Sequence, residues 1–285
     1  MSKVLLLYNY NAGLRKSQVF LEQLCSVFED SGESVTVRNI DFGANPFEGV
    51  DHADYVVVAG GDGTVGYVVS QMLRYGLDLP LGIIPAGTAN DFALMLGIPS
   101  NPLQAAKRIA RGEVRAVDCG RVNDRYFINI LSFGLFTTTS QRTLGRWKRI
   151  LGRVAYVFEG LRELRDIRAI PLTIRTDDVQ VSERVIMALI FNGRTAGRFP
   201  LAREAQPDDG LLDGVFLLES SFLRMTCDAL RYLCGGKPST IKHLRSRTFK
   251  IETECTDVAT DIDGQQGPEF PLDVECLVSR LKIKS

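Results

Sequence analysis

The chain of 285 residues has little of what several protein classes require. Its two histidines and six scattered cysteines, with no Cys-x-x-Cys pair, give a zinc site little support. Its 34 basic and 34 acidic residues give a formal net charge of zero, which argues against a general nucleic-acid binder. No apolar run approaches the roughly 20 residues that span a bilayer, and no signal peptide opens the chain. We therefore expect a cytoplasmic globular protein with reduced thiols.

The rest of the chain is organised around the stretch 55–66. Its first half is a short β-branched run, typical of a strand buried on both faces. Gly60, Gly61 and Gly63 then predict a tight turn that another backbone or a phosphate can approach closely. Thr64 is the predicted N-cap of a helix, since apolar residues follow it at helical spacing. A strand, a glycine turn and a helix N-terminus aim unpaired amides and a positive dipole end at one point, which suits an anion.

Asp62 is the unexpected member of this turn. A carboxylate repels a phosphate unless a cation or a proton transfer is involved, so Asp62 favours phosphate chemistry over phosphate storage. Two other interpretations compete. Gly61-x-Gly63-x-x-Gly66 also matches the dinucleotide fingerprint, but Asp78 lies before the next strand and not at its end. A lone glycine turn is commonly structural, and without a second motif that would be the default interpretation.

A second unit of the same kind occupies residues 81–94. Its apolar strand enters Gly87-Thr88 and a helix start, where Asn90 and Asp91 are available as caps. Neighbouring parallel strands would place both turns at one carboxyl edge of a sheet, where α/β proteins bind ligands. Together, the motifs at 60–64 and 87–93 resemble the diacylglycerol kinase catalytic-domain family, especially its soluble bacterial lipid kinases, which are related to sphingosine and ceramide kinases.

The order of the expected elements indicates two domains. Up to a helix at 102–111, strands alternate with helices, which predicts a three-layer α/β nucleotide-binding domain (1–119) with a mostly parallel sheet. Beyond it, strands follow one another, with two strong helical patterns at 149–165 and 221–233. This predicts a larger β-rich domain (120–285), antiparallel and sandwich-like. The strands predicted after the helix at 102–111 are 114–119, 125–130, 171–175, 184–192, 211–218, 247–252 and 278–283. The resembled family has this architecture, with the β-rich domain forming the lipid side.

The resemblance implies a kinase that uses ATP and Mg²⁺ to phosphorylate a lipid hydroxyl, diacylglycerol-like. The positions that match the nucleotide-binding residues are Asn9, Gly60, Gly61, Asp62, Gly63, Thr64, Val65, Gly66 and Thr88. Asp62, Asp91 and Asp118 would hold Mg²⁺ through waters, although each alone is equally a capping or turn carboxylate. A second magnesium would bind Asp209 and the carbonyls of Gln206 and Leu211. Turn chemistry explains that acidic segment about as well.

The sequence departs from the family near the C-terminus. These kinases usually carry Asp-Gly-Glu, whose glutamate takes the proton from the lipid hydroxyl, whereas this chain has Asp263-Gly264-Gln265. Glutamine accepts no proton near neutral pH, and losing a general base costs about 10²–10⁴ in rate. Asp62 and Gln265 are the predicted catalytic positions, and Asp62, Asp261 and Asp263 are the candidates to replace the missing base. The alternative is a catalytically weak or silent regulator that binds nucleotide or lipid.

A basic stretch at 142–153 contains no acidic residue. Its members of interest are Arg142, Arg146, Trp147, Lys148, Arg149 and Arg153. It is either a solvated helix face or an anchor on anionic lipid, with the tryptophan at headgroup depth. Because a lipid substrate is implied, we expect peripheral association with the inner face of the membrane. We expect no nucleic-acid partner, and a homodimer is one arrangement to test.

Overall fold

The computed structural model describes residues 1–10, 18–49, 52–134 and 169–285. The basic stretch and the predicted helix at 149–165 lie outside these residues. The elements are β1 Lys3–Tyr8, α1 Gln18–Glu29, β2 Ser34–Asn39, β3 Tyr55–Gly60, α2 Asp62–Arg74, β4 Leu81–Pro85, α3 Asp91–Met95, α4 Pro102–Arg111, β5 Val114–Val122, β6 Arg125–Phe127, β7 Ile130–Gly134, β8 Ile170–Thr176, β9 Gln180–Phe191, β10 Thr195–Ala196, β11 Phe199–Pro200, β12 Leu212–Leu218, α7 Phe222–Leu233, β13 Ile241–Ser246, β14 Thr248–Glu252, β15 Thr260–Ile262, β16 Gln265–Gln266 and β17 Leu272–Lys284. None of the described helices is long and apolar enough to cross a membrane.

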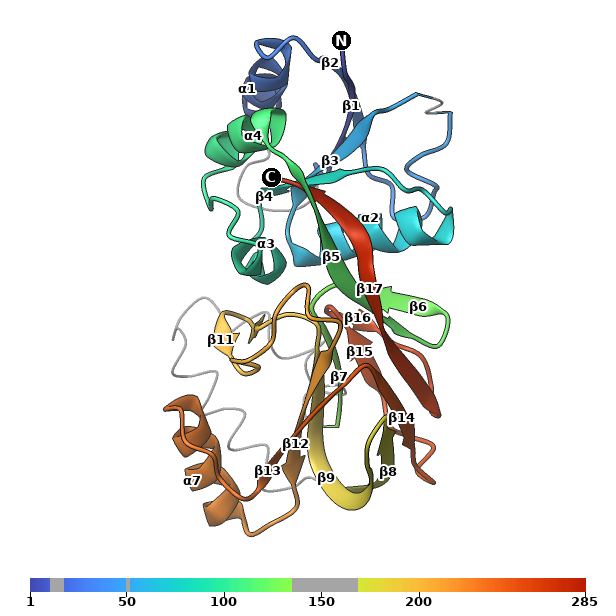
Figure 1. Cartoon of the computed structure of the whole chain (residues 1–285), viewed down its shortest axis with the longest axis vertical. Coiled ribbons are helices and arrows are strands. Elements are labelled where there is room, and N and C mark those ends of the chain that lie inside the picture. The colour runs from blue at the N-terminus through green and yellow to red at the C-terminus, as the bar shows by residue number, and fades with distance from the viewer. Residues whose placement is uncertain (11–17, 50–51, 135–168) are drawn as a thin grey trace.

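The first part of the chain together with the end of β17, here called the α/β half, is a parallel sheet between two layers of helices (Figure 1). Its strands follow the order β17-β4-β3-β1-β2 and are parallel to their neighbours. Alternate residues of β3 explain the layers. Val56 and Val58 pack in one core with Val65 of α2, whereas Val57 packs in a second core with Phe20 of α1. The predicted three-layer α/β fold is confirmed.

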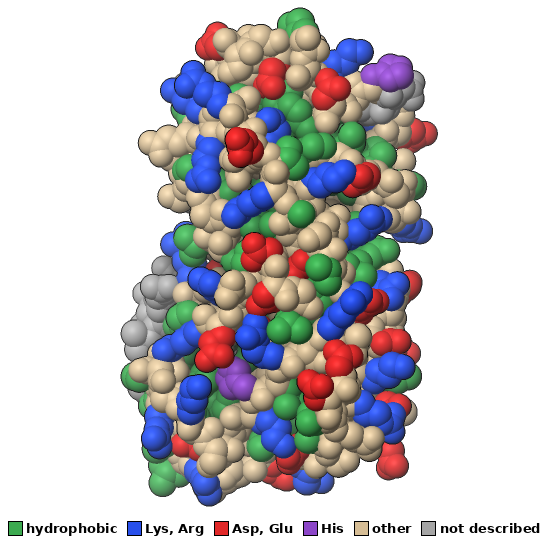
Figure 2. Space-filling view, in the orientation of Figure 1, with side chains coloured by type: hydrophobic (Ala, Val, Ile, Leu, Met, Phe, Trp, Pro, Cys, Tyr) green, Lys and Arg blue, Asp and Glu red, His purple; other side chains and the backbone are tan. Residues whose placement is uncertain are grey.

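The remainder, here called the β-rich half, consists mainly of antiparallel strands, as predicted. Its core contains Leu131, Phe133 and Phe249. The last strand, β17, joins the two halves: it pairs with β14 and β5, and its end runs parallel to β4 through Ile283 and Leu81. The described strands, apart from β10 and β11, therefore form one continuous sheet. Figure 2 shows basic and acidic side chains intermixed over one face of the molecule.

Two local predictions are wrong. The helix after the first glycine turn begins at Asp62 with Gly61 as its N-cap, not at Thr64, because the Gly61 carbonyl accepts hydrogen bonds from the amides of Thr64 and Val65. The predicted strand 125–130 is divided into β6 and β7. The predicted strand 278–283 is confirmed as part of the longer β17, whose register shifts between Leu277 and Leu281.

Candidate functional site

The two glycine turns touch each other at the carboxyl edge of the parallel sheet. β3 and β4 are adjacent, and Gly60 pairs with Pro85. A Cβ atom on Gly87 would lie 2.4 Å from the Cα of Gly61, so the two backbones leave no room for a side chain. Asn90 closes the second turn, because its side chain accepts from the Gly87 amide (2.9 Å) and donates to the Gly87 carbonyl (3.0 Å). The two sequence motifs therefore form one surface.

Gly63 is different, because the protein itself does not require a glycine there. No heavy atom of the described residues lies within 4 Å of the position that its Cβ would occupy, and its φ is not in the left-handed region. Alanine would stabilise a helix by about 1 kcal/mol relative to glycine. The amides of Asp62 and Gly63 also precede the first helical hydrogen bonds, which the Thr64 and Val65 amides make to Gly61. The open space and the free helix end suit an incoming anion.

Asp62 carries a carboxylate into the middle of this surface. It accepts a hydrogen bond from the Phe92 amide at 3.1 Å, which ties α2 to α3. Burial raises the pKa of Asp62; the Phe92 amide opposes the shift, and the charge of Asp91 adds to it. Neither aspartate has an ion pair with any described residue. Two neighbouring carboxylates without a cation favour a bound metal ion or a shared proton.

The other predicted nucleotide-binding residues lie around this edge. Asn9 is buried, and its Nδ2 donates to Thr64 Oγ1 at 3.4 Å. The Val65 side chain packs in the core, so only its backbone faces the turn. Thr88 is exposed on the second turn. The structure thus brings the predicted residues to one place, and their contacts with a nucleotide stay predictions.

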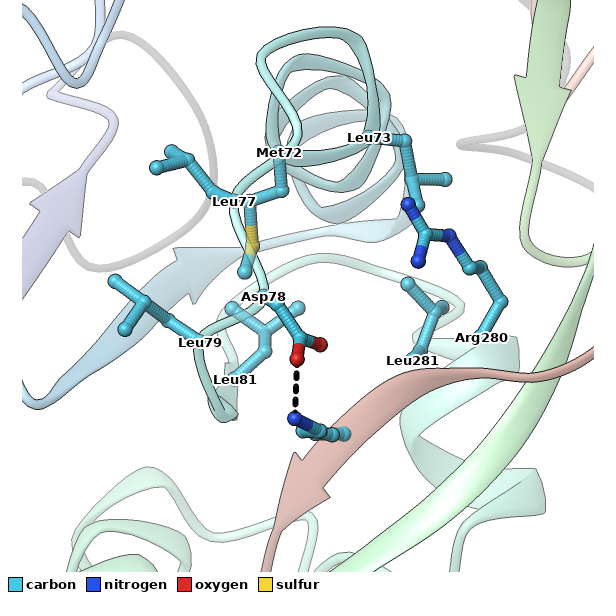
Figure 3. A pocket seen from close by; sticks show the side chains of 9 residues that line it. Met72, Leu73, Leu77, Asp78, Leu79, Leu81, Arg280 and Leu281 are labelled. Atoms are coloured by element: carbon cyan, nitrogen blue, oxygen red, sulfur yellow. Dashed lines mark hydrogen bonds and ion pairs between the residues drawn. The ribbon is translucent and has the colours of Figure 1, made fainter.

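Asp78, which the dinucleotide interpretation would need at a strand end, lies elsewhere. It forms an ion pair with Lys282 at 2.5 Å. Figure 3 shows Asp78, with a dashed line for this ion pair, beside a small pocket at the C-terminal end of α2. The pocket is lined mainly by leucines. This is the opposite end of α2 from the glycine turn, so Asp78 takes no part in the site.

Asp91 connects the second turn to the β-rich half. Its residue is 4% exposed, and Oδ1 accepts hydrogen bonds from Thr195 Oγ1 (2.7 Å) and the Arg198 amide (2.9 Å). The Arg198 guanidinium also donates to the Ala89 carbonyl at 3.2 Å. Sequence reasoning missed Thr195 and Arg198 as partners. The only signal was the motif Asn192-Gly-Arg-x-x-Gly197. Thr195 lies within this motif, and Arg198 follows it directly.

Asp263 lies at the turn between β15 and β16, beside α2. Its carboxylate accepts hydrogen bonds from the three amides of Ile128, Asn129 and Ile130, at 2.8, 3.1 and 2.9 Å. These bonds explain why β6 and β7 are separate strands. A Cβ on Gly66 would lie 3.4 Å from the Asp263 carboxylate, so this turn rests on α2. Burial raises the pKa of Asp263 to about 7, the amides oppose the shift, and Asp62 adds to it.

Both carboxylate oxygens of Asp118 accept hydrogen bonds from backbone amides. Oδ2 accepts from the Gly210 amide at 2.7 Å and Oδ1 from the Ser279 amide at 2.6 Å. In the described ranges, no three His, Cys, Asp or Glu side chains lie close enough together to hold a metal ion. Asp62, Asp91 and Asp118 therefore do not form a direct ligand triad. The predicted network through waters stays a prediction.

Two buried asparagines fit such a hydrated cation. The Oδ1 atoms of Asn129 and Asn192 are buried without a hydrogen-bond partner among the described residues. Asn129 Nδ2 donates to the Thr195 carbonyl, next to the contact with Asp91, and Asn192 Nδ2 donates to the Asp118 carbonyl. Burying an amide oxygen without a hydrogen-bond partner destabilises the fold unless a water molecule or a cation binds to it. Mg²⁺ prefers oxygen ligands and keeps part of its hydration shell.

The second predicted magnesium site does not fit in this arrangement. Asp209 Oδ2 pairs with Arg245 at 2.5 Å, and Asp209 Oδ1 accepts from the Leu211 amide at 3.0 Å. Arg245 also lies 3.2 Å from Asp213, whose pKa is raised to about 6 by burial. The guanidinium already neutralises this acidic turn. We therefore derive no chemistry from Gln206, Asp209 and Leu211.

Comparison with known proteins agrees with this geometry. Residues 3–122 match the family model described as "Diacylglycerol kinase catalytic domain", and residues 130–285 match the "YegS C-terminal NAD kinase beta sandwich-like domain". This chain belongs to the diacylglycerol kinase catalytic domain family. The first match covers both glycine turns, and the second covers Asp263 and the partners of Asp91, which are Thr195 and Arg198.

Similar proteins support the same assignment along nearly the whole chain. The diacylglycerol kinase of Bacillus subtilis is 28% identical, over 95% of this chain and 92% of that protein. The diacylglycerol kinase of Staphylococcus epidermidis is 30% identical, over 81% of this chain and 73% of that protein. A solved Bacillus anthracis structure superposes with a TM-score of 0.86 at 26% identity, and covers 99% of this chain and 95% of that one. The family is one of lipid kinases.

Proposed function

We propose that this protein is an ATP- and Mg²⁺-dependent kinase that phosphorylates the hydroxyl group of a diacylglycerol-like lipid. The observation that carries the proposal is the open first turn. Among the described residues, no atom fills the space beside Gly63, and no cation pairs with the Asp62 carboxylate. Amides that make no helical hydrogen bond, such as those at the first residues of α2, suit the phosphates of a nucleotide. The carboxylate suits the metal ion that accompanies those phosphates in phosphoryl transfer.

The residues have separable roles in this proposal. The amides of Asp62 and Gly63 bind nucleotide phosphate, while Asn9 fixes the turn through Thr64. Mg²⁺, when bound, would neutralise charge on the transferred phosphoryl group, and Asp62 and Asp91 would hold it, directly or through water. Asn90 keeps the second turn closed against the first. The lipid hydroxyl approaches from the side of the β-rich half.

The test is transfer of the labelled γ-phosphoryl group of ATP to a panel of lipids in mixed vesicles. We expect phosphorylated lipid only when Mg²⁺ is present, and a loss of product on chelation. Binding of ATP without product from any lipid in the panel would contradict the proposal. It would favour the second candidate, a silent regulator that binds nucleotide or lipid, for which Gln265 is the motivating residue.

The partners and the location rest on the sequence alone. We propose that the protein is cytoplasmic and associates with the inner face of the membrane through the basic stretch 142–153. Sedimentation with anionic vesicles should fall as salt rises, because each basic residue near such a surface contributes about 1 kcal/mol that salt screens. Light scattering after size-exclusion chromatography tests the homodimer.

A further inference from the structure

Helix α7 carries apolar side chains on two opposite faces. On its inner face, Met225 and Ala229 pack against Ile241 of β13, and Tyr232 packs in a neighbouring core. Its outer face carries a second row at helical spacing, here called the outer stripe, which consists of Leu223, Cys227, Leu230 and Cys234. A surface helix normally presents polar side chains on the face away from the core. The outer stripe therefore needs an explanation that the fold does not supply.

The outer stripe is exposed. Leu223 is 72% exposed, the highest value for a large apolar side chain of the described residues after Met1, and Leu230 is 46% exposed. Cys227 and Cys234 are exposed as well, and a cysteine side chain behaves as a small apolar group. An apolar row in contact with water, rather than a single side chain, is the kind of surface that a partner covers.

The charges around the outer stripe are basic. The exposed charged residues of the segment 221–237 are Arg224, Arg231 and Lys237. Arg224 and Arg231 lie along one flank of the stripe, seven positions apart in the helix. Asp228, the acidic residue of this segment, is half-buried. A partner that complements this surface must therefore combine an apolar part with negative charge.

An anionic phospholipid membrane meets both requirements. A helix with an apolar face and arginines beside it can lie in the plane of the interface, with leucines among the acyl chains and guanidinium groups at the phosphates. A second copy of α7 meets only the first requirement, because its own segment 221–237 exposes no acid. In an antiparallel pair, Arg224 would also approach Arg231 of the copy, and such like-charge contacts oppose association.

The end of α7 is bound to the segment that reaches the candidate site. Arg203 Nη2 donates to the carbonyls of Tyr232 and Leu233, at 3.3 and 2.6 Å, and so completes the C-terminus of the helix. Arg203 follows β11, in the segment whose Arg198 amide donates to Asp91. Figure 1 shows α7, β11 and α3 along one side of the molecule. A membrane docked on α7 is thus connected to the site through a short stretch of chain.

We propose that the outer stripe of α7, with Arg224 and Arg231 beside it, docks on the surface of an anionic phospholipid membrane. The inference rests on the proposed function for its lipid partner. It names the surface through which the protein meets the membrane that contains its substrate. Docking requires no nucleotide, so it is measured separately from turnover, and the two proposals can fail independently.

Sedimentation with vesicles in the absence of nucleotide tests the apolar part. We expect Leu223→Ser with Leu230→Ser to lower partitioning onto phosphatidylglycerol vesicles by at least about tenfold, because both leucines leave water on docking. The melting temperature should not change, since neither side chain is part of the core. The matched control is Val37→Ser with Val114→Ser, which removes two exposed apolar side chains from the α/β half and should sediment as the wild type.

The same measurement tests the charged part. Arg224→Gln with Arg231→Gln should weaken binding to phosphatidylglycerol vesicles by about fivefold or more at low salt, because each basic residue near an anionic surface attracts it. Binding to vesicles of phosphatidylcholine alone should stay as in the wild type. An equal loss on both kinds of vesicle would overturn the anionic membrane as the partner.

Partitioning of the leucine variant like that of the wild type would overturn the proposal and leave the basic stretch 142–153 as the surface to test. A wild-type dimer that the leucine changes convert to a monomer, with vesicle binding unchanged, would also overturn it and make a second copy the occupant. If the serine variant does not fold, Leu223→Ala with Leu230→Ala gives the same comparison. Leucine-dependent docking without phosphorylation of any lipid would support the docking surface and overturn the proposed function.

Discussion

The two glycine turns of the α/β half follow neighbouring strands and lead into helices, yet they use their polar groups differently. In the first turn, no described atom lies close to the Cβ position of Gly63, and the Asp62 carboxylate accepts a hydrogen bond from the Phe92 amide. In the second, Gly87 has no space around it, and Asp91 is occupied by the β-rich half. Similar motifs thus give a binding turn and a supporting turn.

The difference arises from what each turn packs against. The second turn lies between the first turn and the hairpin β10–β11, so its groups are satisfied within the protein. In the first turn, no atom of the described residues lies within 4 Å of the position that a Cβ on Gly63 would occupy. A residue of the first turn should therefore affect ligand chemistry when changed, and a residue of the second should affect stability. Four experiments test this division.

The largest effect is expected at Asp62. Asp62→Asn keeps an acceptor for the Phe92 amide, so the fold should survive, but it removes the charge that would meet the metal ion. We expect Mg²⁺-dependent turnover to fall by about 10²–10⁴, with the circular dichroism spectrum unchanged. Asp124→Asn, at an exposed acid, is the control. Turnover close to that of the control would remove Asp62 from the mechanism.

The next effect concerns the support that the first turn receives from Asp263. Its pKa of about 7 in the folded protein lies above the ordinary 3.8, so the folded state holds an extra proton between these values. Stability should therefore fall as pH rises from about 4 to 7, by at most about 1.4 kcal/mol per pH unit from this group. Asp213, with a pKa of about 6, acts in the same direction.

Urea denaturation at several pH values measures how the free energy of unfolding depends on pH, in the wild type and in Asp263→Asn. Above pH 6, where Asp213 contributes little, the free energy of unfolding of the variant should no longer fall with pH. The variant should also be less stable at pH 5, because an amide cannot accept from all three backbone amides that Asp263 contacts. An equally steep slope in both proteins would show that another group carries it.

A smaller effect is expected at Gly87, in the supporting turn. Gly87→Ala places a methyl group 2.4 Å from the Gly61 Cα and 2.9 Å from Asn90 Oδ1, so the two turns must separate. Overpacking of this kind costs about 1–3 kcal/mol. We expect a lower urea midpoint, with turnover lost in proportion to the displacement of the first turn. Wild-type stability would mean that the turns adjust freely.

The smallest change in stability is expected at Gly63, in the binding turn. Gly63→Ala has space for its methyl group, so stability should stay the same or rise by about 0.5–1 kcal/mol. The methyl group would obstruct a phosphate, and we expect the KM for ATP to rise about tenfold, equivalent to roughly 1.4 kcal/mol. An unchanged KM with unchanged stability would show that the nucleotide does not approach this turn.

Much of the α/β half was predictable from the sequence, because its signals are local. The apolar run at β3 predicted a buried strand, and the glycines with following helical periodicity predicted the turns. The same periodicity, alternating with strands, predicted three layers. In the β-rich half, the class was predictable but several short strands, such as β15 and β16, were not. Two or three residues carry no periodic signal.

By itself, the sequence determined the sheet classes, the two glycine turns and the resemblance that names the family. The tertiary structure alone decided how the carboxylates are used. Asp91 meets Thr195 across 104 residues, Asp263 meets Asn129 across 134, and Asp118 meets Ser279 across 161. No spacing rule reports such contacts, because they depend on where the folded halves bring distant backbone amides. Whether an aspartate can hold a cation or a proton is decided by those amides, since each hydrogen bond uses a lone pair that a ligand would need.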